Sequence, residues 1–277
     1  MTDTFTGHLH KMQATTKQPI EYWLTLDDQP LHVNAWLGKP LTLTYQGQIH
    51  CLHCGKQTRK SFNQGYCYPC FIRLAQCDLC IVKPEQCHYA QGTCREPDWA
   101  QQFCFQPHIV YLANASGIKV GITRSSQIPQ RWIDQGAIQA LPILQARSRY
   151  LSGLAEICIA QHVSDKTSWQ KMLKNQTEPM DLLAWRDDLL SLCAEPLAAI
   201  RAQHGDDALV EVNHAQAIDL SYPVLTYPEK VKSFNLDKTA IVSGLLQGIK
   251  GQYWLFDTGV INIRKFAGYQ VSLHIDH

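Results

Sequence analysis

Residues 51–70 read CLHCGKQTRKSFNQGYCYPC and contain two Cys-x-x-Cys pairs separated by twelve residues. Zinc prefers four thiolates in a tetrahedron, and each Cys-x-x-Cys turn presents two sulfurs to one ion. Gly55 follows the first pair, where a turn with positive φ lets backbone amides approach the sulfurs. The spacing therefore predicts a closed, structural zinc site made by Cys51, Cys54, Cys67 and Cys70.

More candidate ligands follow this stretch. We expect a second structural zinc ion at Cys77, Cys80, Cys87 and Cys94, with His88 or Cys104 as substitute ligands. The same four thiolates would also suit an iron–sulfur cluster. We favour zinc because nothing else in the chain looks redox-active. Both metal ions would then be structural and would stabilise the fold.

The composition limits the function classes. The chain has 277 residues, 45% hydrophobic and 18% charged, with a net charge of +1, which excludes a disordered polycation. Clustered Cys-x-x-Cys pairs favour metal binding in a reducing compartment. The start, Met1 to Phe5, lacks a basic and apolar leader, and no apolar run reaches the ~20 residues of a bilayer span. We expect a cytoplasmic protein that does not contact a membrane.

The charge distribution divides the chain. Residues 105–176 carry a net +5, whereas residues 177–219 carry a net −7. In the acidic stretch, leucines recur at helical intervals between Met180 and His204, and Gly205 is a plausible stop. These shifts predict an α+β protein with five segments, which are N-terminal β-strands (1–50), a cysteine-rich zinc-ribbon-like module (51–104), a middle α/β domain (105–176), a helical segment (177–216) and a C-terminal β unit (217–277).

Both ends of the chain show strand patterns. Apolar and polar residues alternate in residues 19–50, which predicts a meander with strands at Tyr22–Leu26, His32–Trp36 and Leu41–Tyr45. Glycines punctuate similar patterns after Ala217. Because short terminal β pieces are marginal alone, we expect the two ends to pair in one β domain, with a small barrel as one form of it. No internal repeat is evident.

The middle segment begins with a hairpin and a helix. Strands are expected at Ile109–Ala113 and Ile118–Thr123, and a helix from Gln130. Here the residues resemble the GIY-YIG nuclease superfamily over about residues 108–176, with Val110-Tyr111-Leu112 as the first motif and Lys119-Val120-Gly121 as the second. The resemblance implies a GIY-YIG-like α/β domain.

The resemblance also implies three catalytic residues. Tyr111 would position or deprotonate the attacking water, Arg131 would clamp a phosphate oxygen, and Glu156 would ligate Mg²⁺ or Mn²⁺. Val120 stands where the second motif has a tyrosine, and Asn175 is the nearest match to a terminal asparagine.

A second resemblance covers more of the chain. The cysteine module together with the string Arg131-Trp132-Ile133-Asp134-Gln135-Gly136-Ala137 resembles a prokaryotic family of uncharacterised function. That resemblance implies no activity.

The basic middle segment favours nucleic acid as the partner. Basic side chains contact phosphates and aromatic rings stack on unpaired bases; the candidates are Lys119, Arg124, Arg147 and Arg149. We therefore expect a zinc-stabilised protein that binds DNA or structured RNA, with a divalent-metal endonuclease as the sharper form of this prediction. The alternative is a non-catalytic module with a degenerate site that binds RNA, a ribosome or a protein.

Overall fold

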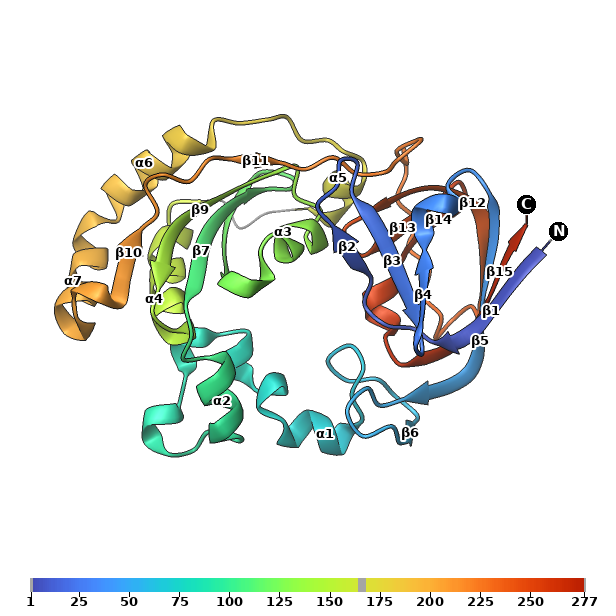
Figure 1. Cartoon of the computed structure of the whole chain (residues 1–277), viewed down its shortest axis with the longest axis horizontal. Coiled ribbons are helices and arrows are strands. Elements are labelled where there is room, and N and C mark those ends of the chain that lie inside the picture. The colour runs from blue at the N-terminus through green and yellow to red at the C-terminus, as the bar shows by residue number, and fades with distance from the viewer. Residues whose placement is uncertain (1, 164–167, 277) are drawn as a thin grey trace.

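The computed structural model describes residues 2–163 and 168–276. Figure 1 shows two lobes side by side, with the cysteine-rich segment (51–104) joining them along one edge. The helices of the described residues include α1 (Tyr68–Arg73), α2 (Pro97–Phe103), α3 (Gln130–Asp134), α4 (Arg149–Ala160), α5 (Trp169–Leu173), α6 (Leu182–Leu192) and α7 (Ala194–His204).

The first lobe, here called the β lobe, contains strands from both ends of the chain. Its larger sheet has the order β1 (Thr2–His8), β15 (Tyr269–Asp276), β5 (Pro40–His50), β12 (Ile241–Lys250), β13 (Tyr253–Phe256), β14 (Gly259–Asn262), with β6 (Gln57–Thr58) also on β5. Leu43 of β5 lies opposite Val242 on one side and Leu273 on the other. The two ends therefore pair as expected. The barrel was a wrong expectation, because β1 and β14 stand unpaired with each other at opposite ends of this sheet.

A smaller sheet of the β lobe corrects one predicted strand. It contains β2 (Gln13–Thr15), β3 (Glu21–Leu26) and β4 (Gln29–His32), but the next residues form a 3-10 turn, η1 (Val33–Trp36). Side chains three residues apart share one face of such a turn, so Val33 and Trp36 are both buried. The Asn34 side chain accepts from the Tyr22 amide at 2.8 Å, which fixes the turn to β3.

The β lobe contains one unit twice, which corrects the expectation of no internal repeat. The unit is a hairpin, a 3-10 turn, a glycine with positive φ and a long strand; it occurs as β3-β4-η1-β5 and as β13-β14-η8-β15, where η8 is Ile263–Phe266. Gly38 (φ +77°) and Gly268 (φ +86°) occupy the same place in the two copies. The copies interlock, because their long strands, β5 and β15, pair with each other. The sequence signal is Tyr22-Trp23-Leu24 against Tyr253-Trp254-Leu255.

The second lobe, here called the α/β lobe, contains the middle of the chain. Its sheet has the order β10 (Leu209–Glu211), β9 (Gln139–Ala146), β7 (His108–Asn114), β8 (Ile118–Arg124), with β11 (Ile218–Asp219) also on β9. The expected hairpin is present as β7 and β8, and α3 follows it. Successive side chains of a strand face opposite sides. Tyr111 accordingly joins the core shared with the β lobe, whereas Val110 and Leu112 join the core beneath α4.

The acidic segment forms two helices at the outer edge of the α/β lobe (Figure 1). Asp181 caps the N-terminus of α6 by accepting from the amides of Leu183 and Ala184. Gly205, with φ +98°, follows α7. The helical prediction for this segment is therefore confirmed. Across residues 2–163 and 168–276, we find no helix whose length and apolar character would let it cross a bilayer.

Candidate functional site

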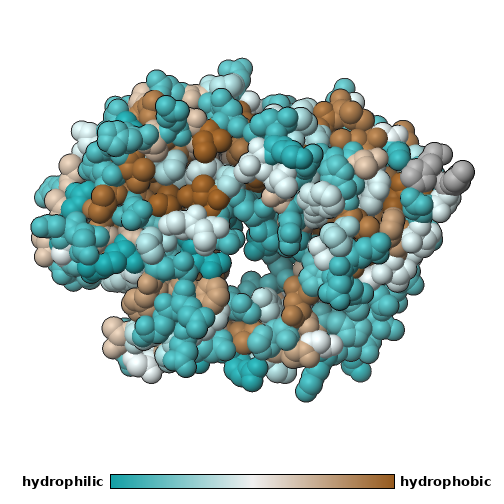
Figure 2. All heavy atoms as spheres, viewed as in Figure 1, coloured by the Kyte–Doolittle hydropathy of each residue, from teal (hydrophilic) through white to brown (hydrophobic). Residues whose placement is uncertain are grey.

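A cleft of about 670 Å³ lies between the two lobes and the cysteine-rich segment. Figure 2 shows it as a hollow near the centre of the molecule. Its lining contains more cations than anions among the described residues; the charged side chains are Lys11, Arg124, Arg131, Arg149, Arg264, Asp134 and Glu156. This excess of positive charge in a concave site favours an anionic ligand.

Tyr111 lies beneath this cleft in β7 and is fully buried. Its hydroxyl donates to Oε1 of Gln135 at 3.1 Å. Gly121 of β8 stands directly opposite, and a Cβ at that position would lie 2.7 Å from the Tyr111 hydroxyl. A side chain at position 121 would therefore displace the phenol. Tyr111 and Gly121 therefore constrain each other in this chain.

Arg131 reaches the same place from α3. It lines the cleft together with Gln135, one turn further along the chain. Burial raises the pKa of Tyr111, and the neighbouring Arg131 guanidinium opposes that rise. A cation beside a phenol favours the phenolate. Arg131 and Tyr111 therefore act on each other electrostatically.

Glu156 approaches from the second helix of the α/β lobe, α4, which begins at the Ser148 N-cap. It lines the cleft with Arg131 and Arg149. Desolvation raises the pKa of Glu156 to about 7, although Arg149 and Arg131 pull it down. The carboxyl group thus titrates near neutrality. The structure brings the three residues predicted as catalytic to one cleft, with Tyr111 beneath it and Arg131 and Glu156 in its wall.

The four basic residues predicted to bind nucleic acid do not share one place. Arg124 and Arg149 line the cleft, and Lys119 lines an adjoining hollow with Glu156. Arg147 is not part of the cleft lining and is held in an ion pair with Asp207 at 2.6 Å. Asn175 accepts from the buried Lys250 at 2.8 Å and is likewise outside the cleft lining.

Two cations in the cleft were missed by sequence reasoning because they come from the β lobe. Lys11 precedes β2 and pairs with the buried Asp134, which also accepts from Gln252 at 2.9 Å. Arg264 lies in η8 and lines the same cleft. Only the pairing of the two chain ends places both beside Arg131, so no local pattern could have revealed them.

The first cysteine group consists of Cys51, Cys54, Cys67 and Cys70. All four sulfurs lie within 4.8 Å of one another, and those of Cys54 and Cys67 are 3.8 Å apart. A tetrahedron with Zn–S bonds of about 2.3 Å has sulfurs about 3.8 Å apart. Gly55, with φ +69°, follows the first pair. The residues therefore form a cluster compatible with zinc, as the sequence predicts.

The second cysteine group differs from the predicted set. Cys77 packs in the small core of the first group. Cys104, which follows α2, takes its place, so a small enclosed pocket is lined by Cys80, Cys87, Cys94 and Cys104. Sequence reasoning chose Cys77 because it forms a Cys-x-x-Cys pair with Cys80. The two cysteines belong to different turns, Cys77 to η2 (Ala75–Cys77) and Cys80 to η3 (Leu79–Ile81).

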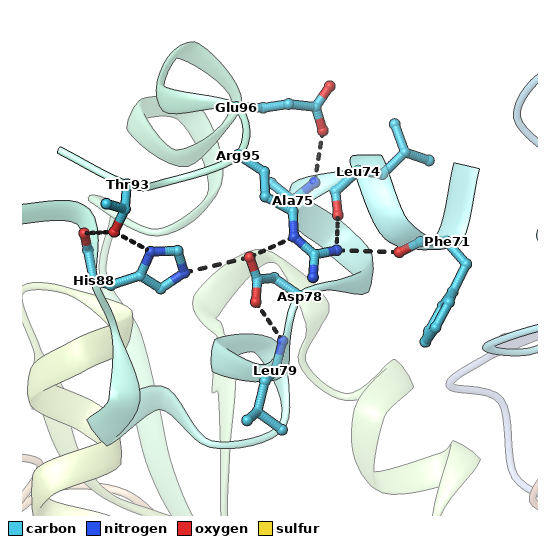
Figure 3. Close-up of polar contacts among 9 residues, drawn as sticks. All are labelled: Phe71, Leu74, Ala75, Asp78, Leu79, His88, Thr93, Arg95 and Glu96. Carbon is cyan, nitrogen blue, oxygen red and sulfur yellow. Dashed lines mark hydrogen bonds and ion pairs between the residues drawn. The ribbon is translucent and has the colours of Figure 1, made fainter. Parts of the chain in front are cut away.

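His88 is engaged elsewhere. Figure 3 shows its ring between Thr93 and Asp78, with Nδ1 2.8 Å from the Thr93 hydroxyl and Nε2 3.3 Å from Oδ2 of Asp78. Asp78 also pairs with Arg95 at 2.8 Å, and Arg95 donates to the Phe71 carbonyl. These contacts form a network, here called the Asp78 network, that ties the second cysteine group to α1. Both ring nitrogens of His88 have protein partners, and a ring nitrogen also lies within 4.8 Å of ligand atoms of Asp78 and Cys80. His88 as a substitute ligand therefore stays a prediction.

A family model described as a protein of unknown function (DUF2797) matches residues 38–271. The chain belongs to this family. The match spans the cysteine-rich segment, the whole α/β lobe and much of the β lobe, which agrees with the uncharacterised family expected from the sequence. No curated protein and no solved structure matches this DUF2797 chain.

Proposed function

We propose that the DUF2797 protein binds nucleic acid in the cleft and that Tyr111, Arg131 and Glu156 form a divalent-metal phosphodiesterase site of the GIY-YIG kind. The observation that carries the proposal is the register of β7 and β8. Tyr111 lies opposite Gly121, with its hydroxyl 2.7 Å from where a Cβ of residue 121 would lie, and Arg131 and Glu156 stand in the cleft wall above it.

The charge of the cleft supports a phosphate ligand. Its lining has five cationic side chains and two acidic ones, and Lys11 already neutralises one of the acids, Asp134. Among the described residues, the buried Nε of Arg149 has no hydrogen-bond partner. Buried donors normally have an acceptor, and a phosphate oxygen would supply one.

Each candidate residue has a chemical role in this proposal. The Tyr111 hydroxyl, whose own proton is donated to Gln135, accepts a hydrogen bond from the attacking water and so orients it. Deprotonation of that water by Tyr111 would require the phenolate, which the Arg131 charge favours and burial disfavours. Arg131 then also stabilises the charge that develops on the phosphate. Glu156 holds Mg²⁺ or Mn²⁺, and a bound cation would favour its ionised form over the neutral form that desolvation favours.

We also propose that the first cysteine group holds a structural zinc ion and that the protein is cytoplasmic, because clustered free thiols suit a reducing compartment. A second candidate function is binding without cleavage, to RNA or to a protein. Val120, which lines the cleft where the second motif has a tyrosine, favours it because valine cannot transfer a proton.

A nuclease assay separates the two candidates. The full chain is incubated with labelled single-stranded DNA, duplex DNA and hairpin RNA, with Mg²⁺, Mn²⁺ or chelator. We expect metal-dependent cleavage that Glu156→Gln and Arg131→Ala each abolish, whereas Arg147→Ala, outside the cleft lining, leaves it unchanged. Salt-dependent binding without cleavage would favour the second candidate. Cleavage that survives Glu156→Gln would refute the assigned site.

A further inference from the structure

The second cysteine group, Cys80, Cys87, Cys94 and Cys104, surrounds an enclosed pocket rather than a point. The pocket is walled by the aromatic side chains of Tyr89, Trp99 and Phe105 as well as by the four thiols. Cys87, Cys94 and Cys104 all lie close enough to Cys80 to act on it electrostatically. Four thiols of one small segment therefore converge on one closed, largely apolar space.

The spacing of these sulfurs differs from that of the first group. Within the described part of the chain, two sets of three or more ligand atoms lie within 4.8 Å of one another. They are the first cysteine group and the set Asp78, Cys80 and His88. The four sulfurs of the second group do not form such a set. Asp78 and His88 are already bound to Arg95 and Thr93. A single zinc ion would need sulfurs about 3.8 Å apart.

The origin of the four cysteines also differs. In the first group they come as two Cys-x-x-Cys pairs, the arrangement typical of zinc ribbons. In the second group six, six and nine residues separate successive cysteines. Each thiol therefore comes from a separate turn, among them η3 (Leu79–Ile81) for Cys80 and the end of α2 for Cys104. Separate turns can hold sulfurs around a larger group.

We propose that this second group holds a [4Fe–4S] cluster through Cys80, Cys87, Cys94 and Cys104. A cluster places iron and sulfide between its four thiolates, so its ligands stand farther apart than those of one zinc ion, and an apolar shell suits it. The same protein would then carry zinc in the first group and a cluster in the second. This proposal does not depend on nuclease activity.

The site has a direct connection to the cleft. Arg149 lines the cleft on one side and lines a second small pocket with Cys80, Cys87 and Cys104 on the other. The Arg149 amide donates to the Cys104 carbonyl at 2.8 Å, and its guanidinium donates to the Ile81 carbonyl. The cluster would thus position Arg149 without contacting the ligand of the cleft.

Metal and sulfide analysis of the full chain, purified without oxygen from cells supplied with iron and zinc, tests the proposal. We expect one zinc ion with about four iron and about four acid-labile sulfide per chain, together with a broad visible absorption band. Protein that holds two zinc ions, or that acquires no sulfide even after incubation with ferrous iron and sulfide, would overturn the cluster. Four second-group thiols found as disulfides would also overturn it.

Variants assign the ligands. Cys87→Ser combined with Cys104→Ser should lose almost all iron and sulfide and keep its zinc, which also reports that the first group remains folded. Cys77→Ser and Cys158→Ser are matched controls, since Cys77 packs with the first group and Cys158 lies in α4. Both controls should keep iron, sulfide and the visible band. Loss of iron from Cys77→Ser, with retention in the double variant, would refute the assignment.

Discussion

The two cysteine groups use the same ligand type but rest on different supports. The first group lies in a short stretch held by backbone hydrogen bonds, such as Cys51 to Lys56 and Leu52 to Gly65, and by a small core in which Leu74 packs with the cysteines. The second group is surrounded by the Asp78 network, which joins three segments by side chains (Figure 3). Bound metal therefore contributes a larger share of the folding stability of the first group than of the second.

The largest effect is expected from removing two ligands of the first group. Cys51→Ser combined with Cys70→Ser should release zinc and unfold residues 52–70, lowering the free energy of unfolding by about 5 kcal/mol or more, because structural zinc contributes about 10–16 kcal/mol to folding of small fingers. Zinc content and limited proteolysis measure it. The matched double variant Cys87→Ser, Cys94→Ser should show a smaller loss. Equal losses in the two double variants would contradict the comparison.

The Asp78 network should have the next largest effect. Asp78→Asn removes the charge that faces Arg95 and His88, and Asp78 is only 11% exposed. We expect a cost of about 2–3 kcal/mol, because breaking one partner of a largely buried pair leaves the other uncompensated. Urea unfolding at pH 7 measures it, with Asp98→Asn on the exposed start of α2 as the control. If Asp78→Asn lowered the free energy of unfolding no more than the control does, the Asp78 network would not stabilise the second group.

The cleft contrasts with both cysteine groups, since Glu156 is held there at a cost to stability. Its folded pKa of about 7 lies above the usual 4.5, so its contribution is fully present below about pH 4.5 and is lost as the pH rises through 7. Glu156→Gln should therefore be more stable than the natural chain by about 2 kcal/mol at pH 8 and not at pH 4.5. Urea unfolding at both pH values in chelator measures the difference. A pH-independent difference would show that Glu156 is not desolvated.

The smallest effect is expected at Cys77, which divides the two groups. Cys77→Ala should lower stability by about 1 kcal/mol through lost packing alone, with metal and sulfide contents unchanged. Thermal unfolding with metal analysis checks this. If the Cys77→Ala variant lost a metal ion, Cys77 would be a metal ligand and the division of cysteines between the two groups would be wrong.

The sequence predicted what depends on local spacing. The first cysteine group, the β7–β8 hairpin and the two acidic helices are each encoded by residues close together in the chain. The sequence did not predict the features that depend on contacts between segments distant in the chain. Cys104, predicted only as a substitute, lines the second pocket while Cys77 packs with the first group, and Val33–Trp36 forms a 3-10 turn because Asn34 binds β3. The cations Lys11 and Arg264 reach the cleft only through pairing of the two ends.

The interlocked strands also fix an order of events during synthesis. The two long neighbours of β5 in its sheet, β12 and β15, lie near the end of the chain, whereas the two-residue β6 follows β5 closely. At about 5–20 residues per second, a ribosome needs on the order of ten seconds or more to make the intervening residues. Through that interval β5 lacks both of its long neighbours, while the cysteine-rich segment and the α/β lobe are being synthesised. A nascent chain released before β12 would therefore carry two folded inner parts attached to an unpaired strand, which is a template for aggregation.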